Sequence, residues 1–334
     1  METATDTAAG LAPALRDRLP ELELRQDGGV RVGDRWITAD APHRLRRELG
    51  SALYVAWHAG STTRDRRMPR RDTRTEELLT AAVPHAETPA AGVVGDDGPD
   101  TVDGEVVVEF GRIRVRVPAD AVTPDGGPAP EPGTRVTVRL PAVRPALSPG
   151  FLLVHGPHGG LAHRGEVVRL YVHVADPGHA PALWGETLRV LGGTGVRYQA
   201  KVLSRSWSYP RQDAIVVYLD AEDAPAAAQV VARLRGMPGL GDGTSCFAHR
   251  LAPGLAMAYD PRDPLEPVVR QSFGQHRANA VADAVVRHAA DPGHIALADA
   301  VCESLLAVSA DPAGPARNLG SPQLPPGEAD EAHR

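Results

Sequence analysis

Lys201 is the only lysine in a chain of 334 residues that also carries 35 arginines. A cation that serves solubility or an ion pair can be arginine, so those needs do not explain the one lysine. Arginine keeps its proton near neutral pH, whereas a partly desolvated lysine can lose it. A need for a neutral amine, as base or nucleophile, would explain the lysine. Composition leaves this interpretation level with chance retention, and the neighbouring residues favour the first.

A predicted strand at residues 167–174 brings three polar side chains to one face. Its sequence, VVRLYVHV, alternates valine or leucine with Arg169, Tyr171 and His173. Successive side chains of a strand point to opposite faces, so one face is apolar and the other presents a guanidinium, a phenol and an imidazole. A solvated sheet face remains the alternative interpretation.

Two further predicted strands carry residues of the same kinds. The strand at 196–203 places Lys201 on its polar face together with Gln199. The strand at 214–219 is preceded by Arg211 and Asp213 and contains Tyr218. We expect the Asp213 carboxylate to hold Arg211 in place rather than to act chemically.

A predicted helix at 273–288 adds cations at its start. Ser272 is expected to cap its N-terminus, and His276 and Arg277 fall in its first turns, where an anion is stabilised. Together with the arginines of the strands, these residues predict an anion pocket. Phosphate is the anion that suits several arginines.

The order of these segments resembles that of the HopA-type effector family. The resemblance spans about residues 145–290, and five motifs in one order are more specific than any one of them. The five segments are RLYVH at 169–173, AKVL at 200–203, YPRQDAIVVY at 209–218, APG through DP at 252–261, and SFGQHR at 272–277, and LSPGF at 147–151 upstream also fits.

This resemblance implies a lyase of peptide maturation. Similar bacterial members occur with ribosomal-peptide gene clusters, especially those of class V lanthipeptides and thioamitide-like products. The implied reaction eliminates phosphate from phosphoserine or phosphothreonine of a precursor peptide and gives dehydroalanine or dehydrobutyrine. The implied partners are the phosphorylated precursor peptide, a peptide kinase and a cyclase. The chain order of His, Lys and Arg is also similar to that of phosphothreonine lyases, in which a lysine removes the α-proton and a histidine is the acid.

Phosphate elimination sets the expected roles of the site residues. It needs a base for the Cα proton, positive charge for the leaving phosphate and often an acid for the bridging oxygen. It needs no metal or organic cofactor, and none is expected. Lys201 is the expected base and His173 the expected acid, with His276 as the alternative acid. Phosphate binding is expected from Arg169, Arg211 and Arg277, orientation from Tyr171 and Tyr218, and support from Asp213.

A second function class remains open. The same pocket could serve a non-catalytic subunit that binds a phosphopeptide or a leader peptide within a biosynthetic complex. The single lysine favours the enzyme, because a phosphate site could be built from arginine alone.

The periodicity of the chain predicts an α+β fold in which a mixed sheet with flanking helices positions the site. Leucines at helical spacing over 43–58 predict a helix, and period-two alternation over 102–155 predicts strands. The expected organisation is a helical N-terminal segment and linker at 1–100, a small antiparallel β subdomain at 101–158, an α+β catalytic region at 159–310, and a disordered tail at 311–334.

Charge and composition exclude several classes of protein. A net charge of −6 gives no general case for nucleic acid or a membrane surface. No apolar run reaches membrane-spanning length, and the N-terminus lacks a secretion signal, so we expect a cytoplasmic protein. Cys246 and Cys302 are too isolated for a disulfide framework or a metal knuckle.

Two further features of the sequence give weaker evidence of function. The histidines of HGPHGGLAH at 155–163 lack cysteine or carboxylate partners, so a solvated loop is favoured over a metal site. The arginines between Arg64 and Arg74 suit either a grip on an acidic leader peptide or partner kinase, or a solvated linker.

Overall fold

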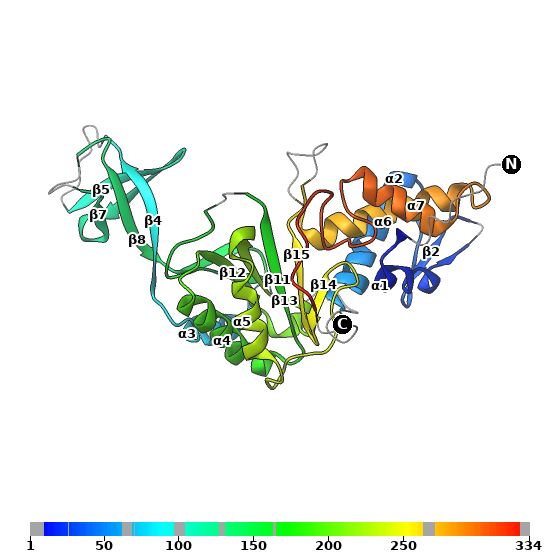
Figure 1. Ribbon diagram of the computed structural model, residues 1–334, viewed down its shortest axis with the longest axis horizontal. Helices are drawn as coiled ribbons and strands as arrows, with labels where there is room; N and C mark the ends of the chain where they lie inside the picture. Colours follow the sequence, from blue (N-terminus) through cyan, green and yellow to red (C-terminus); the bar gives the residue numbers. More distant parts are fainter. Residues whose placement is uncertain are drawn as a thin grey trace.

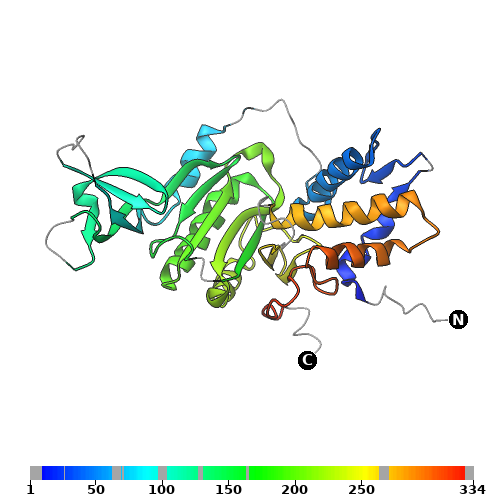
Figure 2. The same cartoon turned by 90° about the horizontal axis from the view of Figure 1, so that it is seen from above.

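The computed structural model describes residues 10–25, 27–61, 69, 71–96, 104–126, 131–162, 165–262 and 271–327. The fold is α+β, as predicted, with three antiparallel sheets and several helices (Figure 1). A small sheet lies at one end, the largest sheet lies in the middle, and a helical part built from both ends of the chain lies at the other end (Figures 1 and 2).

The central sheet has seven strands in the order β14-β15-β11-β13-β12-β10-β9. All its strand pairings in the described ranges are antiparallel, whereas a mixed sheet was expected. Its strands are β9 (Val143–Ser148), β10 (Phe151–His155), β11 (Val167–Val174), β12 (Tyr198–Leu203), β13 (Arg211–Asp220), β14 (His249–Ala252) and β15 (Leu255–Tyr259).

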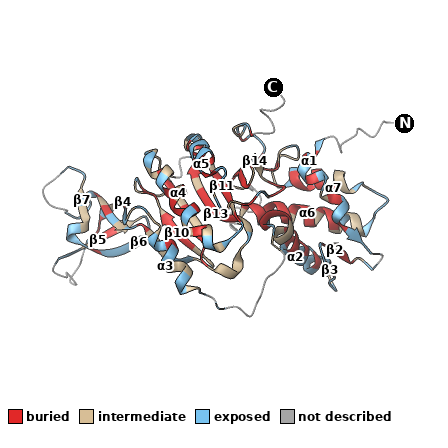
Figure 3. Cartoon of the chain, turned by 90° about the horizontal axis from the view of Figure 1, so that it is seen from below, coloured by how far each residue is buried: buried red, intermediate tan, exposed pale blue. Residues whose placement is uncertain are grey.

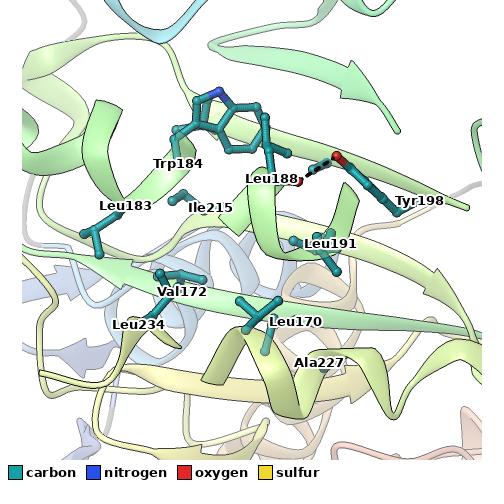
Figure 4. Close-up of a cluster of buried hydrophobic side chains, with 14 of the residues drawn as sticks. Leu170, Val172, Leu183, Trp184, Leu188, Leu191, Tyr198, Ile215, Ala227 and Leu234 are labelled. Atoms are coloured by element: carbon teal, nitrogen blue, oxygen red, sulfur yellow. Dashed lines mark hydrogen bonds between the residues drawn. The ribbon is translucent and has the colours of Figure 1, made fainter. Parts of the chain in front are cut away.

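One face of this sheet forms the larger apolar core. Valines and leucines of β11, β12 and β13 pack there against Trp184, Leu188 and Leu191, all fully buried (Figure 4). Burial of these side chains stabilises the sheet. The helices that contribute to this core are α3 (Thr73–Ala81), α4 (Ala180–Gly193) and α5 (Ala226–Leu234).

The opposite face meets helices from the two ends of the chain. A second core joins Tyr171, Val216 and Ala258 of the sheet to Trp57 and Phe273 of these helices. In it α2 packs along α6, which is mostly buried (Figure 3). The helices are α1 (Pro13–Arg16), α2 (Pro42–Leu53), the π-helix η3 (Tyr54–Ala59), α6 (Phe273–Ala290) and α7 (Leu297–Ala307), beside a sheet of β1 (Glu23–Leu24), β2 (Val30–Val32) and β3 (Arg35–Ile37). None of the described helices is long and apolar enough to cross a membrane.

The small sheet has the order β6-β5-β4-β8-β7 and its own core of five valines. Strand β4 lies in the stretch expected to be linker, and β9 and β10, expected in the small subdomain, join the central sheet instead. The pairing of β10 with β12 places both strands in the central sheet. Local periodicity predicts a strand but does not indicate its distant partner. The strands are β4 (Glu87–Val94), β5 (Glu105–Phe110), β6 (Ile113–Pro118), β7 (Val122–Pro124) and β8 (Arg135–Pro141). Short 3₁₀ turns are η2 (Leu19–Glu21), η4 (Ala119–Ala121), η5 (Pro177–His179), η6 (Ser206–Ser208) and η7 (Ala221–Asp223).

The stretch 311–327 is a packed segment rather than the start of a disordered tail. Its backbone accepts hydrogen bonds from Ala12 N at 2.9 Å and Tyr259 N at 2.8 Å. Ala316, Asn318 and Ser321 are buried. Composition rich in Pro, Gly and Ala predicts disorder, but backbone carbonyls that pair with the rest of the fold hold this stretch in place. Residues 328–334 lie outside the described ranges.

Candidate functional site

Strand pairing places the predicted polar residues on one face of the central sheet. Tyr171 of β11 pairs with Val216 of β13, and Val216 pairs with Lys201 of β12. The next row contains Arg169 and Tyr218. Neighbouring strands are about 4.8 Å apart, so Tyr171 and Lys201 stand about 10 Å apart across the sheet. The sequence-predicted face therefore exists, and it points toward the helices.

The amine of Lys201 lies among aromatic rings. Its Nζ is 4.5 Å from the centroid of the Phe151 ring and 5.6 Å from that of Tyr218, and the side chain is half-buried. The guanidinium carbon of Arg211 is 6.0 Å from the same Phe151 centroid. The Phe151 ring thus lies near both cations. Lys201 Nζ and the Arg211 guanidinium carbon can be no farther apart than the sum of their distances to the centroid of this ring.

A cavity of about 370 Å³ opens beside this pair of cations. It lies between the sheet, the π-helix η3 and the start of α6. Lys201 does not line the cavity itself, but the Phe151 ring that it contacts does. Polar side chains that line the cavity are Tyr54, Ser61, Arg205, Ser208, Arg211 and Gln275.

Arg211 is held in the cavity by two partners. Its Nε and Nη2 donate to the two carboxylate oxygens of Asp213 at 2.7 Å each, and Nη2 also donates to Tyr54 Oη at 2.8 Å. The Tyr54 hydroxyl donates in turn to Asp213 Oδ2 at 3.1 Å. Burial alone would raise the pKa of Asp213, but the charge and hydrogen bonds of Arg211 hold that pKa well below its usual range. The pair is therefore ionised and fixed in orientation, the supporting geometry expected of Asp213.

His58 is a site residue that the sequence analysis did not identify. Its imidazole is 3% exposed, and its centroid is 5.2 Å from the Tyr171 ring. Nδ1 lies 2.9 Å from Ser245 Oγ, and Nε2 lies 3.8 Å from Asp213 Oδ2. Burial, followed by nearby cations that include Arg211, lowers the pKa of His58 to about 4, although Asp213 opposes the shift. His58 is thus neutral at pH 7.

The signal that could have found Tyr54 and His58 is only partial. The two residues are four apart in a predicted helix, so they share a face. Nothing in the sequence shows that this face meets a sheet more than 100 residues later in the chain. The helix also widens into a π-helix at this point, a feature frequent at functional sites.

Protonation of His58 makes a testable contribution to stability. Its pKa is about 4 in the folded protein and 6.5 in the unfolded chain. Between these values the unfolded chain binds more protons, so stability falls as pH drops from about 6.5 to about 4 and this contribution levels off below. The loss reaches about 3 kcal/mol. We expect His58→Phe, which keeps a ring against Tyr171, to flatten this slope in urea unfolding at pH 7 and pH 4.5.

The control for this measurement is His158→Phe, at an exposed position in a turn. It should keep the acid slope of the parent protein. A His58→Phe variant that is as sensitive to acid as the parent would contradict the assignment of the slope to His58.

Arg169 and Tyr171 are largely engaged with neighbours of their own. Arg169 is 8% exposed and forms an ion pair with Asp260. Its guanidinium carbon lies 5.0 Å from the centroid of the Tyr218 ring. Burial raises the pKa of Tyr171, so its phenol stays protonated. Arg169 and Tyr171 lie on the polar face of the sheet, but neither lines the cavity.

His173 lies at the far end of β11. Its Nδ1 is 3.1 Å from the carbonyl oxygen of Gly243, and burial lowers its pKa below the usual value. A register shift between Val172 and Val174 separates it from the row that holds Lys201. The structure does not bring His173 into the cavity.

Arg277 and His276 are buried behind the site. Arg277 is fully buried and donates to the carbonyl oxygens of Pro315 at 2.8 Å and Arg317 at 3.1 Å, to Asn318 Oδ1 at 3.0 Å, and to Nδ1 of His276 at 2.7 Å. These bonds anchor the segment 311–327, and neither residue lines the cavity. The expected phosphate contact of Arg277 is replaced by this structural role, because its donors already have acceptors.

The start of α6 does reach the cavity, through a different residue. Ser272 caps the helix as predicted, with Oγ accepting from Gln275 N at 3.4 Å. Gln275, in the first turn, lines the cavity.

The weaker sequence signals add no described residue to the lining of the cavity. Within the described ranges no cluster of three His, Cys, Asp or Glu side chains could hold a metal ion. His163 and the arginines at 64, 66, 67 and 70 lie outside those ranges. Cys246 and Cys302 are buried and form no disulfide within the described residues.

Comparisons with known proteins point to one family. The model of the HopA1 effector protein family matches residues 142–317, more than half of the chain. An effector protein from Pseudomonas syringae pv. tomato strain DC3000 has a similar structure, with 15% identity, a TM-score of 0.46, and coverage of 84% of this chain and 91% of that one. An effector from P. syringae pv. syringae strain 61 gives 13% identity, a TM-score of 0.45, and coverage of 84% and 99%. No curated protein matches the sequence.

Proposed function

This chain belongs to the HopA1 effector protein family, and we propose that it is a lyase acting on phosphorylated peptides. It would eliminate phosphate from phosphoserine or phosphothreonine of a ribosomally made precursor peptide, as in lanthipeptide or thioamitide maturation. A peptide kinase would supply this substrate, and a cyclase would consume the dehydroalanine or dehydrobutyrine product.

The observation that carries the proposal is the position of Lys201. The one lysine of the chain is half-buried, and it shares the Phe151 ring with a fixed arginine at the edge of a polar cavity. A base beside a phosphate-binding cation is the arrangement that elimination needs.

The proposed reaction uses these two side chains. The neutral amine of Lys201 takes the proton from Cα, the electron pair of that bond forms the Cα=Cβ double bond, and the Cβ–O bond breaks. The phosphate leaves with the electrons of the Cβ–O bond, and its charge is stabilised by Arg211. We propose no proton transfer from His173, because that side chain lies outside the cavity.

Mass spectrometry of a phosphopeptide incubated with the protein tests the function. Elimination removes the mass of phosphoric acid and leaves a dehydrated residue, whereas a phosphatase would remove only HPO₃ and restore the hydroxyl. The Lys201→Arg variant serves as the control for contaminating activity. An unchanged peptide, with a substrate that the protein binds, would contradict the proposal.

Arg211 is expected to bind the phosphate group. Arg211→Gln should weaken phosphopeptide binding by about 1.5–3 kcal/mol, because a charge-assisted contact is lost. Titration with a phosphorylated peptide and its unphosphorylated counterpart measures this, and the difference between the two affinities should shrink. Since Asp213 loses its partner, a thermal melt must show that the variant is folded. An unchanged difference in a folded variant would move the phosphate elsewhere.

A non-catalytic role remains the second candidate. Lys201 does not line the cavity itself, which suits a subunit that binds a phosphopeptide or a leader peptide without reacting. Such a protein would bind the phosphorylated peptide in the titration and return it unaltered in the mass spectrum.

A further inference from the structure

We propose that Arg205 is a second phosphate-binding residue and supplies the uncompensated positive charge of the cavity. The ligand would be a phosphate monoester held between Arg205 and Arg211. The inference rests on the proposed function for its substrate, a phosphorylated peptide, but the binding it predicts can be measured without turnover.

Arg205 reaches the cavity from a loop that the sequence analysis did not single out. It follows β12 and lines the same cavity as Arg211. Its guanidinium lies over Gly150, where an added Cβ would stand 3.5 Å from the guanidinium carbon. Gly150 has a φ of +82°, a left-handed conformation that favours glycine, so the turn before β10 keeps a residue without a side chain beside the Arg205 guanidinium.

Three hydrogen bonds to two partners hold the loop that carries Arg205. Asp72 Oδ2 accepts from Ser206 N at 3.0 Å and from Ser206 Oγ at 2.7 Å. On the other side, Ser204 N donates to the carbonyl oxygen of Gly150 at 3.0 Å. Burial would raise the pKa of Asp72, but its hydrogen bonds, first those from Ser206, lower that pKa to about 2. The Asp72 carboxylate that holds the loop is therefore ionised at neutral pH. Arg205 is thus presented by a fixed loop.

No described side chain compensates the charge of Arg205. Among the described residues it has no carboxylate partner, and its buried Nε has no hydrogen-bond acceptor. By contrast, the charge of Arg211 is compensated by Asp213, and that of Arg169 by Asp260. An anion that enters the cavity therefore gains most from Arg205, whereas Arg211 offers directed donors.

A phosphate monoester fits this arrangement better than a carboxylate does. Two guanidinium groups, one from β13 and one from the loop after β12, line the cavity together with Ser61, Ser208 and Gln275. A tetrahedral dianion can accept from several such donors at once, whereas a planar monoanion is satisfied by one guanidinium.

The test compares Arg205→Gln with the parent protein by calorimetric titration. The probes are inorganic phosphate and a short synthetic peptide with one phosphothreonine, alongside its unphosphorylated counterpart. We expect at least a tenfold weaker affinity for both phosphorylated probes and no change for the unphosphorylated peptide. The matched control is Arg189→Gln, which removes an exposed arginine on the opposite side of the sheet and leaves Glu186 paired with Arg233.

A second variant tests whether the hydrogen bonds of Asp72 affect phosphate binding through Arg205. Asp72→Asn keeps the helix-capping oxygen but loses the acceptor of the Ser206 bonds. It should weaken phosphate binding in the parent and have no further effect in the Arg205→Gln background, because it acts through Arg205. Additive effects of the two substitutions would contradict this coupling.

The outcomes distinguish this inference from the proposed function. Tight phosphate binding that depends on Arg205, with no elimination, supports the inference and contradicts the lyase. Elimination with an unchanged KM in Arg205→Gln supports the lyase and overturns the inference. A parent protein that binds neither phosphorylated probe overturns it as well.

Discussion

Lys201→Arg is expected to abolish conversion of phosphothreonine to dehydrobutyrine and to leave phosphopeptide binding nearly intact. The substitution keeps the positive charge and about the same reach, so an electrostatic role would survive it. Arginine keeps its proton near neutral pH, so a proton-abstracting role would not survive the substitution. A positioned base contributes about 10²–10⁴-fold to a rate, and a loss of this size is expected. The product is followed by mass spectrometry, and binding by titration with the phosphorylated peptide.

The control exchanges the same two residue types, in the opposite direction, just before the same strand. Arg197, also half-buried, precedes β12 and donates through Nε to the carbonyl oxygen of Gly160 at 2.9 Å. Arg197→Lys should keep normal dehydration, because this contact needs only one donor. If Lys201→Arg retains near-normal dehydration, the single lysine is an accident of composition and the base lies elsewhere.

Arg277→Ala is expected to lower the free energy of unfolding by about 3–5 kcal/mol. The substitution removes a buried cation and leaves the oxygens of Pro315, Arg317 and Asn318 without their donor. Burial lowers the pKa of Arg277 to about 10, so the group is still charged at pH 7 and its acceptors are needed. Urea unfolding measures the loss. We expect the segment 311–327 to detach first, detected as faster hydrogen exchange of its amides.

Arg46→Ala provides the surface comparison. Arg46 pairs with Asp283 at 2.9 Å across α2 and α6, and both side chains are exposed. An exposed pair contributes about 0–1 kcal/mol, so this variant should unfold nearly as the parent does. A folded Arg277→Ala variant of normal stability that binds phosphate poorly would instead restore Arg277 to the phosphate site.

The sequence by itself determined the strands and the faces of the site. Residues 167–174 form a strand with the predicted bounds, and its polar face carries Arg169, Tyr171 and His173 as expected. The Ser272 cap was predicted for the same reason. Alternation in a strand and capping of a helix depend on neighbours a few residues away, so the local pattern contains the information.

Only the tertiary structure decided which of these residues meet. His58 and Tyr54 reach the sheet from a helix far away in the chain, and Arg205 enters the cavity because a loop is clamped by Asp72. Arg277, predicted to bind phosphate, is turned inward to a segment that composition marks as disordered. Sequence periodicity reports the face on which a residue lies, whereas a partner depends on which elements pack together. The partner then decides whether a cation is neutralised or stays available to an anion, because a buried guanidinium must satisfy its donors with whatever acceptors the fold brings to it.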